Sequence, residues 1–87
     1  MATIRERLEE LERSPKNRTC REVMSLLEAA GAKPRKKSGS HRTYTHPVVD
    51  HPLTVPCHSE GQVLKIPYVK EAIQFLEAIL EQGGDQE

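Results

Sequence analysis

Apolar residues recur at helical spacing in three segments of the chain, residues 3–13, 19–30 and 67–82. In the first two segments a leading Thr precedes a Glu by three residues, which is the spacing of a capping box. Gly31 suits the position after the second helix, and Pro67 suits the first turn of the third. We predict three amphipathic helices whose buried faces are formed by Ile4, Leu8 and Leu11; by Val23, Leu27 and Ala30 with Met24 and Leu26 beside them; and by Val69, Ile73, Leu76 and Leu80.

Between the second and third helices the pattern changes to the period of two that is typical of strands. Residues 41–46 alternate, so that 41, 43 and 45 face one side of a strand and 42, 44 and 46 the other. A preceding strand within 32–37 must be short and at an edge, because Pro34 lacks an N–H donor. We predict a turn at 38–40, a connection at 48–52, a third strand with Leu53, Val55 and Cys57 on its apolar side, and a loop at 59–65.

These elements predict an α+β fold of the order α-β-β-β-α, preceded by an extra N-terminal helix. A three-stranded antiparallel sheet with helices on one face leaves its other face exposed. If Tyr44 and the apolar side of the third strand point toward the helices, His41 and His58 stand on neighbouring strands of the exposed face. We expect a helical extension at 1–14, one domain at 15–82 and a disordered tail at 83–87.

The composition, with 36% hydrophobic and 30% charged residues among 87, predicts one small globular domain. The net charge of zero hides a segregation of charge. Residues 15–70 contain ten Lys and Arg against four acids, and residues 33–42 contain five cations and no acid. This segment is either a polyanion-binding surface or a solvated, lysine-rich turn.

No apolar run reaches the roughly 20 residues that cross a bilayer, and no signal peptide is visible, so we expect a cytoplasmic protein without a membrane partner. Cys20 and Cys57 are far apart in the chain and form no Cys-x-x-Cys motif, which predicts reduced, half-buried thiols rather than a disulfide. His46, His51, Cys57 and His58 lack the close pairs of a structural zinc site, so we expect no metal and no cofactor.

Residues 37–44, with the sequence KSGSHRTY, resemble the signature of the HicA toxin family, a Gly-Ser-His with an aromatic residue three positions after the histidine. The surroundings match as well: a helix ending in LLEAAG at 26–31, a strand with a Pro-x-His ending at 53–58, and a following amphipathic helix. The resemblance runs from about residue 16 to residue 80. Pro34 and the Ile-Pro-Tyr at 66–68 depart from the family pattern, whereas the Gly-Ser-His is intact.

The resemblance implies a double-stranded-RNA-binding-like fold and a role as the toxin of a type II toxin–antitoxin system. It further implies an mRNA interferase, an endoribonuclease that cleaves mRNA without a metal. The implied partners are the mRNA substrate and a HicB-like antitoxin that covers the histidine, with no DNA bound by the toxin itself.

His41 is the candidate catalytic residue, because imidazole titrates near neutral pH and can act as general acid or base when RNA is cleaved by its own 2′-hydroxyl. His58 is a possible second acid or base. A glycine at 39 permits a close approach of backbone to ligand. Lys36, Lys37, Gly39, Ser40 and Arg42 are the residues predicted to bind RNA, mainly through phosphate.

Two other functions stay open at this point. The same basic face would suit an RNA-binding module of this fold that has no catalytic activity. The amphipathic helices would suit an interaction protein whose basic turn is only solvated surface. His46 and His51 are predicted to be loop residues, and Tyr44 is predicted to pack in the core rather than to stack on a base.

Overall fold

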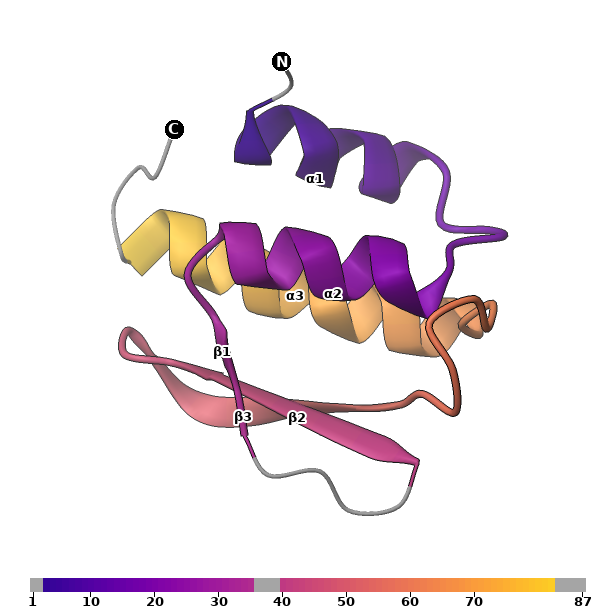
Figure 1. Ribbon diagram of the computed structural model, residues 1–87. Coiled ribbons are helices and arrows are strands. Elements are labelled where there is room, and N and C mark those ends of the chain that lie inside the picture. The colour runs from indigo at the N-terminus through magenta and orange to yellow at the C-terminus, as the bar shows by residue number, and fades with distance from the viewer. Residues whose placement is uncertain (1–2, 36–39, 83–87) are drawn as a thin grey trace.

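The computed structural model describes residues 3–35 and 40–82 of the chain. Figure 1 shows three layers, in which α2 and α3 cover one face of the sheet and α1 packs on the far side of these two helices. The predicted α+β fold, with its double-stranded-RNA-binding-like α-β-β-β-α order and an extra leading helix, is confirmed. The helices are α1 (Ile4–Arg13), α2 (Cys20–Ala29) and α3 (Ile66–Gln82), and the strands are β1 (Lys33–Pro34), β2 (His41–His46) and β3 (Val49–Pro56).

Both predicted capping boxes are present at the starts of α1 and α2. The hydroxyl of Thr19 accepts a hydrogen bond from the backbone N–H of Glu22 over 3.2 Å, and the Glu22 carboxylate accepts one from the N–H of Thr19 over 3.0 Å. The bond from Thr19 lowers the pKa of Glu22, and the guanidinium of Arg18, 3.1 Å away, adds to this effect. The two boxes therefore fix where each of these helices begins.

Gly31 ends α2 in a conformation that favours glycine. Its φ is +94°, and a Cβ added there would lie 3.2 Å from Nε2 of His46. Both the backbone angle and the neighbouring imidazole therefore favour glycine at the point where the chain leaves α2 and enters β1.

The sheet has the order β1-β2-β3 with both pairs antiparallel, so β2 is the central strand. As predicted, β1 is short and lies at an edge. The N–H of Arg35 donates to the carbonyl oxygen of Thr43 over 2.7 Å. Pro34 is paired with Tyr44 at the next position, where a backbone N–H would face the free edge rather than β2. The missing donor of Pro34 therefore costs the sheet no hydrogen bond.

The third strand is longer than the sequence predicts, because it begins at Val49 rather than Leu53. The connection is a turn at 47–48, closed by a 3.2 Å hydrogen bond from the N–H of Val48 to Nδ1 of His46. His46 and His51 thus lie in strands, and their assignment to a loop is wrong. Pro52 is accommodated because β3 is an outer strand with one free side.

The core lies between the sheet and the α2–α3 layer and continues between that layer and α1. Every residue predicted to form a buried helix face is buried, except Ile4, which is partly buried. Tyr44 and the apolar side of β3 face the same core, as predicted. The largest fully buried side chains are those of Phe75, Leu27, Leu76, Ile79, Val23, Val55, Val69 and Cys20.

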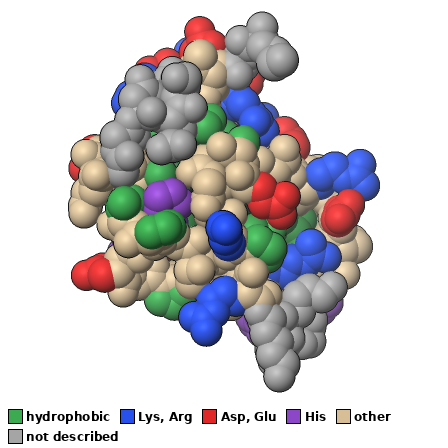
Figure 2. All heavy atoms as spheres, turned by 60° about the vertical axis from the view of Figure 1, so that its left-hand side comes forward, with side chains coloured by type: hydrophobic (Ala, Val, Ile, Leu, Met, Phe, Trp, Pro, Cys, Tyr) green, Lys and Arg blue, Asp and Glu red, His purple; other side chains and the backbone are tan. Residues whose placement is uncertain are grey.

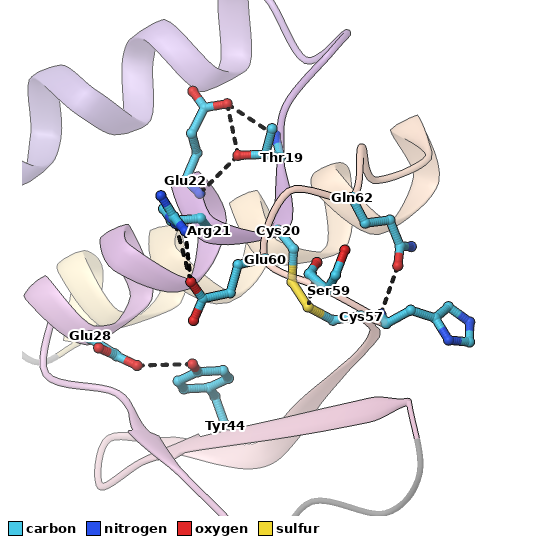
Figure 3. Close-up of a disulfide and its surroundings, with 11 residues drawn as sticks. Thr19, Cys20, Arg21, Glu22, Glu28, Tyr44, Cys57, Ser59, Glu60 and Gln62 are labelled. Carbon is cyan, nitrogen blue, oxygen red and sulfur yellow. Dashed lines mark hydrogen bonds and ion pairs between the residues drawn. A yellow bond between two sulfur atoms is a disulfide. The ribbon is translucent and has the colours of Figure 1, made fainter.

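Cys20 and Cys57 form a disulfide, so the prediction of reduced, half-buried thiols is wrong (Figure 3). The two residues are 37 positions apart in the chain, but the start of α2 lies against the segment that follows β3. Their Cα atoms are 6.1 Å apart, within the range that a disulfide spans, and both residues are buried. Sequence spacing does not show this proximity, because it arises from the packing of a helix against a strand end.

The longest helix, α3, has 17 residues, among them the charged residues Lys70, Glu71, Glu77 and Glu81. Within residues 3–35 and 40–82, no helix combines the length and the apolar character that a membrane crossing requires.

Candidate active site

The face of the sheet away from the helices is hereafter called the open face. Because the N–H of Cys57 donates to the carbonyl oxygen of Ser40, the next pair, His41 and Pro56, is a non-hydrogen-bonded pair whose side chains share one face. Alternation along the strands then assigns the remaining members. The open face includes Lys33 and Arg35 from β1 and its continuation, His41, Thr43 and Thr45 from β2, and Asp50, Pro52, Thr54 and Pro56 from β3.

His41 is the first residue of β2 and its side chain is exposed, as the sequence predicts. Its cross-strand neighbour on the open face is Pro56, which cannot compete for its ring nitrogens. Among the residues that the structure describes, none forms a hydrogen bond or ion pair with the His41 ring. The described part of the chain therefore leaves both ring nitrogens available to an incoming ligand.

Two cations accompany His41 on the open face. Lys33 is paired with Thr45, and Arg35 lies opposite Thr43, which places Arg35 diagonally across from His41 and within reach of a long side chain. Both cations are exposed, and neither forms an ion pair with any residue in 3–35 or 40–82. Their charge is therefore available to a bound anion.

Lys33 and Arg35 are not among the site residues predicted from the sequence. The signal that identifies them is register: alternation through Pro34 puts both on the face of Thr43 and Thr45. By contrast, Arg18 and Arg21, outside the sheet, are paired with acids at 3.1 and 3.0 Å.

Thr43 and Thr54 add polar groups beside His41. Their hydroxyl oxygens are 3.0 Å apart across β2 and β3. Such close contact is typical of a non-hydrogen-bonded antiparallel pair. Each hydroxyl keeps further hydrogen-bonding capacity, so the middle of the open face can donate to a phosphate oxygen.

Arg42 lies on the opposite side of the sheet from His41. It is paired with Val55, which is fully buried, and its own side chain is half-buried, with Nε lacking a hydrogen-bond partner. The next residue on that side is Tyr44, whose hydroxyl donates to Glu28 over 3.0 Å (Figure 3). Burial, together with this bond, raises the pKa of Tyr44 to about 12. The helix-facing side therefore holds Tyr44 as a packing residue, as predicted.

The other predicted RNA-binding residues are described only in part. Ser40 is half-buried, and its carbonyl oxygen accepts the hydrogen bond from Cys57. Lys36, Lys37 and Gly39 lie outside the described residues, as does the predicted tail at 83–87.

His58 does not lie on a strand next to His41, so that part of the prediction is wrong. β3 ends at Pro56 and the chain then turns, with the N–H of His58 donating to Oε1 of Gln62 over 2.7 Å. The side chain of His58 is exposed. Sequence alternation alone does not show that the strand stops two residues before this histidine.

The face of the molecule drawn in Figure 2 carries charges of both signs. In Figure 2, Lys and Arg side chains are interspersed with acidic ones, and hydrophobic side chains form small separate patches. In the described part of the chain, no group of three His, Cys, Asp or Glu side chains is placed to hold a metal ion.

Comparison with known proteins identifies a family for most of the chain. A family model for the HicA toxin of bacterial toxin-antitoxin systems matches residues 20–84, which include α2, the sheet and α3. No curated protein and no solved structure matches the chain. The matched segment starts after α1, so this helix lies outside the region that the family model covers.

Proposed function

Because this chain belongs to the HicA family of toxins from bacterial toxin–antitoxin systems, we propose that it is a metal-independent endoribonuclease that cleaves mRNA. The observation that carries the proposal is the position of His41 on the open face. There an exposed imidazole lies on the same surface as two cations, Lys33 and Arg35, that form no ion pair with any described residue. This combination suits a phosphodiester, which needs charge neutralisation and a proton donor or acceptor.

In the proposed reaction, the 2′-oxygen of a ribose attacks the adjacent phosphorus and the bond from phosphorus to the 5′-oxygen breaks. His41 takes the proton of the 2′-hydroxyl as general base, or delivers a proton to the departing 5′-oxygen as general acid. His58 is proposed as a second acid or base. It is exposed on the segment after β3, two residues beyond Pro56, the partner of His41.

Phosphate binding is proposed for the cations beside His41. Lys33 and Arg35 hold the backbone of the RNA across the open face, and Thr43 donates a hydrogen bond. Lys36, Lys37, Gly39 and Ser40, which precede His41 in the chain, stay proposed RNA contacts. Arg42 is also a proposed RNA contact. Because it is half-buried on the helix-facing side of the sheet, it suits a contact at the edge of the RNA rather than at the reacting phosphate.

The proposed partner is a HicB-like antitoxin that neutralises the toxin by covering His41. The proposed place of action is the cytoplasm, where mRNA is found, and the toxin itself is proposed not to bind DNA. Within residues 3–35 and 40–82 the helices pack on the other face of the sheet, so the open face offers an antitoxin the same surface that it offers RNA.

Replacing His41 tests this function. We expect His41→Ala to keep the fold, to abolish growth arrest when the protein is expressed, and to abolish cleavage of labelled RNA in EDTA. His51→Ala is a matched control, because His51 is another exposed histidine of the sheet and contacts the ring of Phe75 on the helix side. A His41→Ala protein that stays fully toxic would refute the mechanism.

A non-catalytic RNA-binding module is the alternative function. It is favoured by one observation: β3 ends before His58, so the described open face presents a single histidine rather than an acid–base pair. The two functions differ in one assay. Wild-type protein that binds labelled RNA in EDTA without producing new fragments would support the binding module and refute the nuclease.

A further inference from the structure

The Cys20–Cys57 disulfide joins the first residue of α2 to the residue that follows β3 (Figure 3). Both residues are almost completely buried, at 0% and 3% exposed. The proposed cleavage reaction uses neither sulfur atom. This covalent link between the helix layer and the sheet therefore needs a separate explanation.

Cys57 contacts the backbone of the His41 strand end directly. Its N–H donates to the carbonyl oxygen of Ser40, the residue before His41. The residue before Cys57 is Pro56, the cross-strand partner of His41. Any movement of Cys57 is thus transmitted to the position of His41 on the open face.

On its other side, the disulfide anchors Cys57 to the start of α2. The segment after Cys57 is also held there by backbone hydrogen bonds, from Cys20 N–H to Gln62, from Arg21 N–H to Glu60 and from Leu64 N–H to Arg18, at 2.7, 2.9 and 2.8 Å. These bonds hold residues 60–64 and not residue 57. Cutting the disulfide therefore removes the covalent anchor between Cys57 and α2, whereas the hydrogen bonds at residues 58 and 60–64 stay in place.

We propose that the Cys20–Cys57 disulfide is a reducible cross-link that fixes the position of His41, so that a dithiol reductant lowers the ribonuclease activity. This inference rests on the proposed function. In the reduction, the sulfur–sulfur bond breaks, Cys20 and Cys57 each become a thiol, and the dithiol supplies two electrons and two protons and becomes a disulfide itself. Disulfides in reducing compartments are commonly of this responsive kind.

Because both cysteines are buried, a reductant reaches the disulfide only when the neighbouring segment opens. Residues 58–61, all exposed, form the irregular segment beside the disulfide, and Sγ of Cys57 lies 3.6 Å from the carbonyl oxygen of Ser59. A reducing thiolate must wait until this segment opens. A small dithiol such as dithiothreitol therefore reduces the bond slowly in the native protein and quickly after denaturation.

The first test is amide hydrogen exchange on the full chain, oxidised and after reduction with dithiothreitol, at a temperature where circular dichroism shows both forms folded. We expect the protection of the Cys57 amide to fall about tenfold or more on reduction. The Arg35 amide, which bonds to Thr43 at the opposite side of the sheet, is the control and should keep its protection. Unchanged protection at Cys57, or an equal fall at both amides, would overturn the proposal.

The second test is RNA cleavage by the same two preparations in EDTA. We expect kcat to fall several-fold on reduction, with a smaller change in KM, and to recover on reoxidation. A Cys20→Ala/Cys57→Ala protein should not respond to dithiothreitol. Equal cleavage before and after reduction would overturn the redox proposal alone. No cleavage in either state would overturn the proposed function, whereas the amide measurement would still show whether the cross-link fixes the strand end.

Discussion

His41 and Arg42 are adjacent in the chain, yet their side chains leave opposite faces of the sheet. His41 is paired with Pro56 on the open face, and Arg42 is paired with Val55, which is completely buried under the helices. The cation diagonally across from the histidine therefore comes from the continuation of a different strand, β1. It is Arg35, which lies across the sheet from Thr43.

This arrangement predicts that Arg35→Gln weakens RNA binding. Losing one phosphate contact should reduce the slope of log affinity against log salt concentration by about 1. Fluorescence anisotropy with labelled RNA at several salt concentrations measures this slope. Lys70→Gln is the control, because Lys70 is an exposed cation on α3, away from the open face. Equal losses in the two variants would show that the binding surface extends over the helices instead.

The hydrogen bond between Tyr44 and Glu28 predicts a stability effect. Tyr44→Phe should lower the free energy of unfolding by about 1 kcal/mol, because it removes this bond from the core side of β2. Urea denaturation at pH 7 measures the change.

The same tyrosine predicts a loss of stability in alkali. Its pKa is about 12 in the folded protein and near 10 when unfolded, so the folded state retains the proton longer. Stability contributed by Tyr44 is thus complete below pH 10 and falls as the pH rises toward 12. Tyr44→Phe should lack this part of the alkaline loss; an identical pH profile in both proteins would contradict the assignment.

The acidic surroundings of Glu77 on α3 predict that replacing this residue with glutamine stabilises the protein. A hydrogen bond with Glu12 of α1 raises the pKa of Glu77, and the charge of Glu81 adds to this. The folded state therefore favours protonated Glu77, and stability falls as the pH rises through and above its ordinary range. We expect Glu77→Gln to raise the free energy of unfolding at pH 7 by roughly 0.5 kcal/mol or less. A higher melting temperature at this pH would report the gain. The gain should shrink toward pH 4, and a gain independent of pH would argue against carboxylate repulsion.

The burial of Leu8 predicts that the packing of α1 contributes to the stability of the domain. Its side chain is 4% exposed and lies in the same core cluster as residues of α2 and α3. Leu8→Ala should cost about 3 kcal/mol in the free energy of unfolding, whereas the exposed neighbour Glu9→Ala should stay within about 0.5 kcal/mol. A small cost for Leu8→Ala in a single unfolding transition would mean that α1 is only loosely docked.

The helices and their buried faces could be predicted from the sequence because the signals are local. Leu27 and Leu76 repeat with neighbours at helical spacing, and the capping boxes mark where α1 and α2 begin. The exposed side of His41 also follows from a local period of two. In contrast, the start of β3 at Val49 depends on pairing with β2, because residues 50–52 are exposed and carry no apolar pattern.

The missed parts of the candidate site depend on contacts between distant segments. Arg35 joins the site through register with Thr43, which the sequence of β1 alone does not fix. His58 leaves it because β3 stops at Pro56. The disulfide could not be predicted, since Cys20 and Cys57 meet only when α2 packs beside the end of β3. Each of these features requires knowledge of how elements are placed in three dimensions.

Prolines occupy both outer strands of this small sheet, Pro34 on one side and Pro52 and Pro56 on the other. A proline offers no amide hydrogen, so neither border presents an unbroken row of donors to a further strand. Copies of the chain are thereby discouraged from joining their sheets into a polymer. The open face can thus stay accessible to the proposed RNA substrate without edge-to-edge pairing between copies.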